Sequence, residues 1–133
     1  MYLDDLATEI HERKKRRHLE DDLQSSVVEY LRWALPKDAI YLAVPNGGKR
    51  HGREAARMTR LGVRAGAPDL LVLWRGRVCG IELKGPGGTV SEDQQQMHRK
   101  LHACGVPVAV CRSLEEVADA LREWGCPLHA ELT

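Results

Sequence analysis

Residues 66–84 read GAPDLLVLWRGRVCGIELK and are the most informative segment of the chain. Two apolar runs flank the dipeptide Arg75-Gly76, a pattern that predicts a β-hairpin with a two-residue loop. Counting back along both strands from that loop places Asp69 opposite Glu82. The Cβ atoms of directly opposed residues lie about 5 Å apart. The hairpin therefore predicts two carboxylates side by side.

Two carboxylates this close repel unless a cation lies between them or one takes a proton. Lys84 lies two residues beyond Glu82 and so on the same face of its strand. These three side chains predict a metal site with a cation beside it, although a solvated sheet face with a Glu–Lys pair is the simpler alternative. Pro68 suits the first position of a strand. Gly66 and the glycines of 85–88 have no side chains, so we expect the backbone on both sides of the site to leave room for a bulky polymer.

Length and composition indicate one domain with a single core, since the chain has 133 residues. No apolar run is long enough to span a membrane. Asp4 and Asp5, without an apolar segment after them, predict that the N-terminus is not a secretion signal. The cysteines lack CxxC spacing and are expected to be reduced, as in a cytosolic protein. Cys79 alternates with Ile81 and Leu83, so we expect it to face the core.

Basic residues gather in two runs, although the net charge is only +1. The first run is Arg13–Arg17. The second consists of Lys49, Arg50, Arg53, Arg57, Arg60 and Arg64. A solvated surface is the simpler interpretation of either run alone. Because the two runs flank a carboxylate cluster, we expect a phosphate-rich ligand, with the second run contacting nucleic acid.

Local signals predict the element order α-β-(α)-β-β-α-β-α, without a repeat or a second domain. Residues 1–18 are expected to form a basic N-terminal segment outside the core, before a domain spanning 19–133. A helical period begins at Leu19 and is stopped by Pro36. The other predicted elements are a strand at 39–44, a turn at 46–48, a basic helix at 53–61 ended by Gly62, the hairpin, a helix at 91–104, a strand at 107–111 and a helix from Ser113 to Gly125. Capping boxes are predicted for Ser91 with Gln94 and for Ser113 with Glu116.

Two further polar residues fall on apolar helix faces. Glu20 lies within the arc of Leu23 and Val27, whereas Asp22 and Glu29 fall on the opposite side. An acid on a buried face needs a partner or a metal, but an acid in the first turn of a helix also simply suits the helix dipole.

Gln94 shares a helix face with Met97 and Leu101, while Gln95 and Gln96 point away. Closing the capping box is at least as good an explanation of Gln94 as a catalytic role. His98 and His102, four residues apart on the same helix, could bind a metal. Because no third ligand is evident, a surface pair is the expected reading.

Together these motifs resemble those of the VRR-NUC (virus-type replication-repair nuclease) family, within the PD-(D/E)XK restriction-endonuclease-like superfamily. The matching segments are Leu19–Gln24, Pro45–Gly48, Gly66–Asp69, Ile81–Lys84, Ser91–Gln94 and Leu101–Gly105. The similarity runs roughly from Glu20 to Leu121, and the chain looks like the stand-alone, phage-type form of the family.

The resemblance implies a central mixed sheet flanked by helices and hydrolysis of DNA phosphodiester bonds with Mg²⁺ or Mn²⁺. It implies that Asp69, Glu82 and Glu20 hold the metal. Lys84 would orient the attacking water or stabilise charge, and Gln94 would fix Lys84 or the water. It further implies a homodimer that cuts branched or four-way junction DNA in the cytoplasm of a bacterium or a phage-infected cell.

Two rivals belong to other classes. One is a nucleic-acid-binding module that does not cleave, which the intact set of Asp69, Glu82 and Lys84 disfavours. The other is a structural subunit of a phage or repair assembly, for which no salt-dependent DNA binding is expected.

Overall fold

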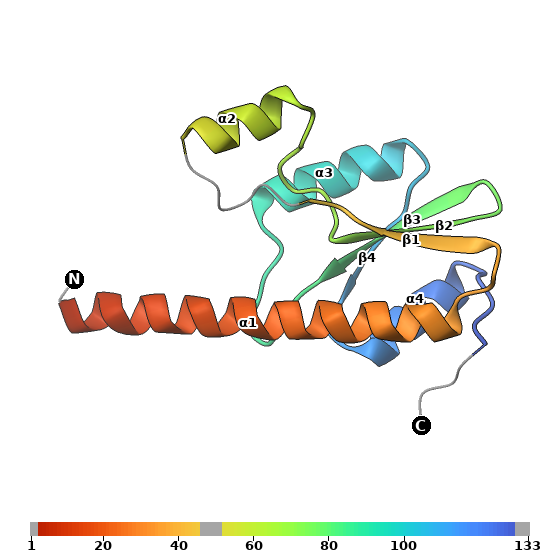
Figure 1. Cartoon of the computed structure of the whole chain (residues 1–133), viewed down its shortest axis with the longest axis horizontal. Helices are drawn as coiled ribbons and strands as arrows, with labels where there is room; N and C mark the ends of the chain where they lie inside the picture. The colour runs from red at the N-terminus through yellow and green to blue at the C-terminus, as the bar shows by residue number, and fades with distance from the viewer. Residues whose placement is uncertain (1–2, 46–51, 130–133) are drawn as a thin grey trace.

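In the computed structural model, which describes residues 3–45 and 52–129, a four-stranded sheet lies between two layers of helices. Figure 1 shows α1 and α4 along one face of the sheet and α2 and α3 on the other side. The elements are α1 (Leu3–Ala34), β1 (Ala39–Ala43), α2 (Arg53–Arg60), β2 (Leu70–Trp74), β3 (Arg77–Leu83), α3 (Glu92–Ala103), β4 (Val108–Cys111) and α4 (Leu114–Glu123). This order confirms the predicted one. The turn predicted at 46–48, together with Lys49 and Arg50, lies outside the described residues.

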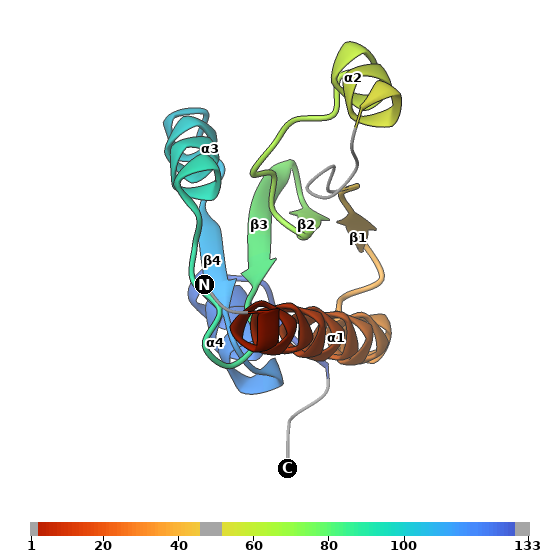
Figure 2. The same ribbon diagram turned by 90° about the vertical axis from the view of Figure 1, so that its left-hand side faces the viewer.

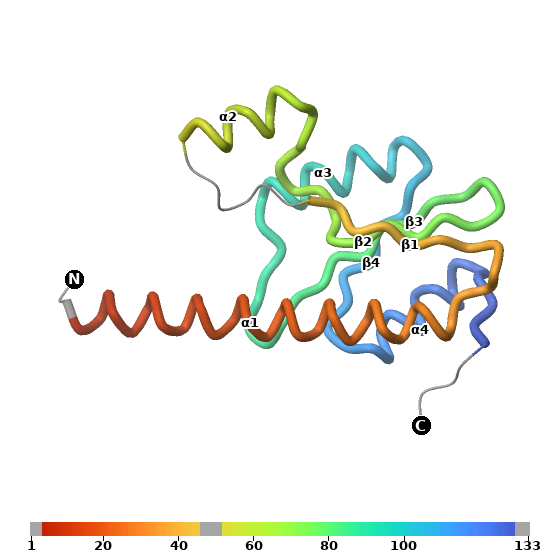
Figure 3. The backbone as a smooth tube through the Cα atoms, in the orientation of Figure 1, coloured from red at the N-terminus to blue at the C-terminus, as the bar shows by residue number. Residues whose placement is uncertain are grey.

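The sheet is mixed, with strand order β1-β2-β3-β4. β1 pairs with β2 and β2 with β3 in antiparallel fashion, while β3 and β4 are parallel. A parallel pair cannot be joined by a tight turn. The chain therefore crosses over through α3 between β3 and β4, as the tube in Figure 3 traces.

The hairpin has the predicted register, with Trp74 opposite Arg77 and Leu70 opposite Ile81. Arg75 has φ 49° and Gly76 has φ 75°. Two successive residues with positive φ are the signature of a type I′ turn, whose twist matches that of the flanking strands. The turn chemistry thus sets the register, and a one-residue slip would move every side chain to the opposite face.

The core lies between the sheet and the pair α1 and α4. Its largest fully buried apolar side chains are Leu31, Leu70, Ile81, Leu121, Val27, Val72 and Val117. Cys79 is buried with Ile81 and Leu83, as the strand alternation predicts. All four cysteines are free; burial raises the pKa of the Cys79 thiol to about 12, which keeps that thiol protonated and unreactive.

α1 continues unbroken across positions 18 and 19, where the sequence suggests a boundary between a segment and a domain. Its first half extends beyond the sheet (Figure 1), and Leu6 and Ile10 remain about two-fifths exposed there. This arm has no buried face, so apolar periodicity could not reveal its helix. Neither Gly nor Pro interrupts it. An ion pair between Arg13 and Glu9, four residues apart, supports it.

Local capping explains where the shorter helices end. Gly62, Gly105 and Gly125 have φ of 99°, 84° and 96° and follow the last residues of α2, α3 and α4. In each case the glycine N–H and the next N–H bond back to carbonyls of the last turn, which is the Schellman motif.

The start of α4 differs from expectation. Ser113 Oγ accepts from Glu116 N–H at 3.1 Å, but the Glu116 carboxylate accepts from Arg112 N–H instead of Ser113. The capping box predicted there is therefore only half formed.

None of the helices in the described part of the chain combines the length and the apolar character that crossing a membrane requires.

Candidate active site

The predicted acids meet where β2 begins and β3 ends. Asp69 directly precedes β2, and the pairing of Leu70 with Ile81 continues outward to Asp69 and Glu82. The backbone N–H of Leu83 donates to Asp69 Oδ2 at 2.7 Å. This bond holds the Asp69 side chain across the end of the hairpin. The structure thus brings Asp69 beside Glu82, as the register predicts.

Glu82 is buried, with only 1% of its surface exposed, and Lys84 follows at 8%. The pKa of Glu82 is raised to about 9, mainly by burial and then by a side-chain hydrogen bond to Asp69 and the negative charge of Asp69. The Lys84 cation opposes this shift, and Glu20 adds to it. Glu82 therefore carries a carboxyl group that is costly to ionise unless a cation is close.

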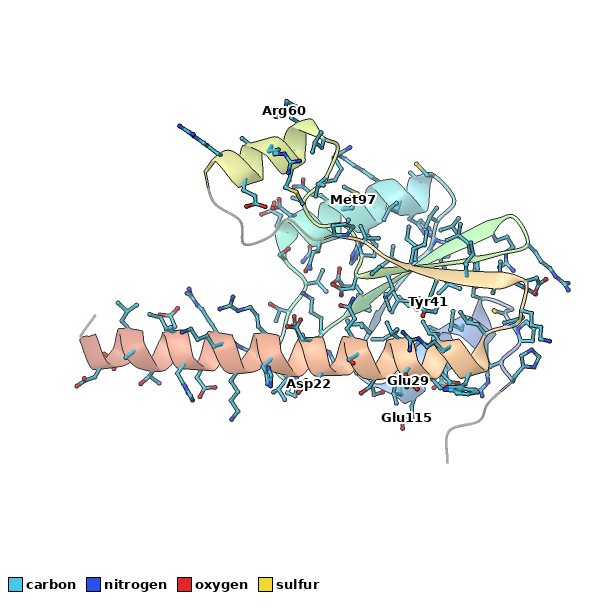
Figure 4. All side chains as sticks on the ribbon, in the orientation of Figure 1. Asp22, Glu29, Tyr41, Arg60, Met97 and Glu115 are labelled. Atoms are coloured by element: carbon cyan, nitrogen blue, oxygen red, sulfur yellow. The ribbon has the colours of Figure 1, made fainter. Side chains whose placement is uncertain are left out.

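Glu20 comes to the site from α1. It is half-buried, whereas Asp22 and Glu29 are exposed (Figure 4), so the helix-face argument is confirmed. A Cβ placed on Gly88 would lie 3.0 Å from Glu20 Oε1, and one on Gly85 would lie 3.3 Å from Glu20 Cγ. The loop after β3 therefore packs directly on this part of α1, and its glycines make room for Glu20.

Gln94 closes the predicted capping box at the start of α3. Its Oε1 accepts from Ser91 N–H at 2.9 Å, and Ser91 Oγ accepts from Gln94 N–H at 3.2 Å. The capping explanation is therefore correct for the Gln94 oxygen. The amide nitrogen of this side chain still has two N–H groups to donate. Gln95 and Gln96 are exposed, as expected, while Gln94 is half-buried.

The surroundings of Gly66, two residues before Pro68, differ from those expected. A Cβ on Gly66 would lie 2.4 Å from the backbone oxygen of Asp93, and Gly66 has φ 82°. Gly66 is therefore buried against the first turn of α3, where it makes a close helix contact and leaves no open space for a polymer. Gly87, with nothing near its Cβ position, keeps the open surroundings that were expected.

His98 belongs to the site, which corrects its reading as half of a surface pair. Its side chain is 16% exposed, and its Nε2 lies 3.4 Å from Glu82 Oε1. His102 is exposed. The sequence held a usable signal, because His98 is four residues after Gln94 on a half-buried helix face. Burial lowers the pKa of His98, and the Lys84 cation lowers it further.

The donor chemistry of the site fits a divalent cation. Asp69 and Glu82 offer the hard oxygen ligands that Mg²⁺ and Mn²⁺ prefer. Among the residues that the structure describes, none gives the buried Glu82 Oε1 a hydrogen bond, and a bound cation would supply the missing partner. Within the described residues, no three His, Cys, Asp or Glu side chains are arranged to hold an ion. Water and phosphate oxygens would therefore have to complete its coordination.

Basic side chains lie on both sides of this end of the sheet. Figure 2 looks onto it, with α1 below and α2 and α3 above. α2 has no buried residue, and its Arg53, Arg57 and Arg60 are exposed, as is Arg64. Figure 4 shows Arg60 on α2. The run Arg13–Arg17 lies on the arm of α1, just before Glu20, and the backbone oxygen of Arg16 lies near Gly85.

A mixed sheet flanked by helices, with paired acids and a lysine at the end of a hairpin, defines an α/β protein with a restriction-endonuclease-like fold. A family model described as "VRR-NUC domain" matches residues 8–115, most of the chain. The chain therefore belongs to the VRR-NUC family, a nuclease family, and the resemblance seen in its motifs is confirmed.

Two solved structures share the fold. One, named "VRR_NUC domain protein", is 23% identical in sequence and has a TM-score of 0.65. The match covers 79% of this chain and 86% of the other chain. The other, named "VRR_NUC domain", is 24% identical in sequence and has a TM-score of 0.52. This match covers 78% of this chain and 94% of the other chain. A search of curated proteins found no match.

Proposed function

We propose that the protein is a metal-dependent endonuclease that hydrolyses DNA phosphodiester bonds with Mg²⁺ or Mn²⁺. The observation that carries this proposal is the meeting of Asp69, buried Glu82 and buried Lys84 at one end of the hairpin. Glu82 is only 1% exposed, and burying an ionised carboxylate without a partner costs free energy, so Glu82 is not an ordinary surface acid. Its position is therefore better explained by a cationic ligand than by solubility.

Asp69 and Glu82 would hold the metal ion, with Glu20 completing its coordination or holding a second ion. When bound, the metal neutralises charge on the phosphate and makes water a stronger nucleophile. The hydrogen bond from Leu83 N–H fixes one oxygen of Asp69, which leaves the rest of that carboxylate oriented toward Glu82. This pre-organisation removes the need to reorder the ligand during the reaction.

Lys84 would donate a hydrogen bond to the attacking water or to a phosphate oxygen in the transition state. Its stem is buried, so its ammonium group is confined to the site, beside Glu82 and His98. The oxygen of Gln94 is engaged with Ser91, and its amide nitrogen would donate to the attacking water. The same water could also accept from Lys84 and so position that ammonium group. These contacts act where negative charge develops.

DNA would approach across α2 and the arm of α1, through Lys49, Arg50, Arg53, Arg57, Arg60 and Arg64 with Arg13–Arg17 opposite. Exposed guanidinium groups make sequence-independent phosphate contacts, and such binding weakens steeply with added salt.

The test is a cleavage assay on labelled linear, nicked, flap and four-way DNAs in Mg²⁺ or Mn²⁺, with EDTA as the metal-free control. Cutting that requires metal and is lost in Glu82→Gln supports the proposal. Salt-dependent binding without cutting would favour the non-cleaving DNA-binding module. Absence of both would favour the structural subunit.

We further infer a homodimer that prefers branched DNA, in phage-type replication or repair within the cytoplasm. One domain offers one site, whereas resolving a four-way junction takes two symmetric cuts, which a two-fold dimer supplies. Light scattering at micromolar concentration measures the mass directly. A clean monomer, or equal cutting rates on linear and four-way DNA, would remove this version and leave a simpler nuclease.

A further inference from the structure

Two buried polar atoms face each other across the interface of β3 and α3. His98 Nε2 and Glu82 Oε1 are 3.4 Å apart. Among the residues that the structure describes, both atoms are buried and neither has a hydrogen-bond partner. Buried polar atoms are nearly always paired, so each such exception requires an explanation.

A direct contact does not satisfy these atoms. Their separation is within reach of a hydrogen bond, yet the geometry does not make one. A salt bridge between the two would also be expected to close into a short, charge-assisted hydrogen bond, typically about 2.7–2.9 Å. Glu82 comes from β3 and His98 from α3, and the two atoms lie 3.4 Å apart without forming a hydrogen bond.

The separation suits two ligands of one cation. Metal–nitrogen and metal–oxygen bonds of about 2.1 Å place neighbouring ligands roughly 3.0–3.4 Å apart, from octahedral to tetrahedral angles. We propose that His98 Nε2 and Glu82 Oε1 are joint ligands of the catalytic divalent cation. This inference rests on the proposed function, because it adds a nitrogen ligand to the carboxylate site.

A nitrogen ligand changes the choice of metal. Mn²⁺ takes carboxylate and water oxygens as Mg²⁺ does, but as a first-row transition metal it also accepts an imidazole nitrogen, which Mg²⁺ avoids. A site in which His98 joins Glu82 therefore favours Mn²⁺ over Mg²⁺. The other open positions are left to water and phosphate oxygens, as is usual for these ions.

Calorimetric titration of the DNA-free protein with MnCl₂ and, separately, MgCl₂ tests this selectivity without an activity readout. The wild type should bind Mn²⁺ more tightly than Mg²⁺, because only Mn²⁺ readily takes the imidazole nitrogen as a ligand. His98→Gln should lose at least about 10-fold in Mn²⁺ affinity, the lower end of what even indirect support of a metal costs, and lose less for Mg²⁺. His102→Gln is the matched control, since this exposed histidine lies one turn further along α3, and it should bind as wild type does.

Electron spin-echo spectroscopy of the Mn²⁺-loaded protein gives a second readout, and its result on the wild type can overturn the proposal without any variant. A nitrogen coupling that is present in wild type and His102→Gln but absent in His98→Gln supports the proposal. Wild type without a nitrogen coupling, or His98→Gln with wild-type Mn²⁺ affinity, overturns it. In either case metal-dependent cutting by wild type would leave the proposed nuclease function standing, whereas loss of both Mn²⁺ binding and cutting would remove the function as well.

Discussion

The backbone N–H of Leu83 donates to Asp69 Oδ2 at 2.7 Å, one residue beyond Glu82 on the opposing strand. This bond ties the Asp69 side chain to β3 and keeps its carboxyl group beside that of Glu82. The register of the strands and the geometry of the site are therefore one structural feature.

Asp69→Asn should abolish cleavage while leaving DNA binding intact. The amide oxygen can still accept from Leu83 N–H, so the hairpin is preserved, but the negative charge that holds a cation is lost. We expect at least about a 100-fold loss in turnover, judged by the cost of removing one transition-state stabiliser. Glu82→Ala and Lys84→Ala should behave alike in single-turnover assays. Wild-type rates in Asp69→Asn would contradict the metal-site model.

The metal-free protein should lose stability between about pH 5 and 9 through Glu82. Its pKa is about 9 in the folded state, against 4.5 for a freely solvated glutamic acid side chain. In that window the folded state binds more protons than the unfolded state, so unfolding becomes easier as pH rises. The pKa of His98 is lowered from the ordinary value of 6.5, so this residue contributes stability that increases as pH rises towards 6.5.

The measurement that isolates Glu82 is thermal unfolding in EDTA across this range, for wild type and Glu82→Gln. The melting temperature of the variant should rise relative to that of the wild type as pH increases. Adding Mn²⁺ should restore the melting temperature of the wild type at high pH. A stability difference that does not change with pH would show that Glu82 is not the group responsible.

Glu20 and Glu29 lie on one helix but face different surroundings, since Glu20 is half-buried by the loop after β3 and Glu29 is exposed. Glu20→Gln should reduce turnover about 10-fold or more, because a ligand of the metal is weakened. Glu29→Gln should cut DNA as wild type does. Equal rates for the two variants, measured at saturating DNA, would mean that Glu20 serves only the helix.

Gln94→Glu separates the two possible uses of this residue. Glutamate also closes a capping box, so the stability of α3 should be kept, whereas the two N–H donors are lost. Turnover should therefore fall while the melting temperature stays within a few degrees. Gln95→Glu, at a neighbouring exposed position, is the control. Unchanged turnover in Gln94→Glu would assign the side chain to capping alone.

Gly66→Ala should destabilise the protein more than Gly87→Ala. Both glycines have positive φ, at 82° and 74°, so both variants suffer similar backbone strain. Only at Gly66 would the new methyl group also collide with the backbone of Asp93. We expect an additional loss of about 1–3 kcal/mol, typical of overpacking. Urea unfolding of both variants measures the difference, and equal losses would exclude the collision.

The hairpin and its acids could be predicted from the sequence because their signals are local. Gly76 in the loop sets the turn, alternation sets the faces, and counting then places Asp69 opposite Glu82. The ends of α2, α3 and α4 were equally predictable, since a cap depends on a few neighbouring residues. The inward position of Glu20 followed from helical periodicity in the same way.

Only the tertiary structure decided the rest. The arm of α1 is helical without an apolar face, so no helical period of apolar residues predicts it. The need for a glycine at position 66 comes from its close approach to the backbone of Asp93, which belongs to a different element. The contact of His98 with Glu82 arises because α3 crosses over between β3 and β4, which brings together side chains that are separated along the chain. Local rules act over a few residues, whereas burial depends on which distant surfaces meet, and in this protein that meeting turned an ordinary histidine into part of the site.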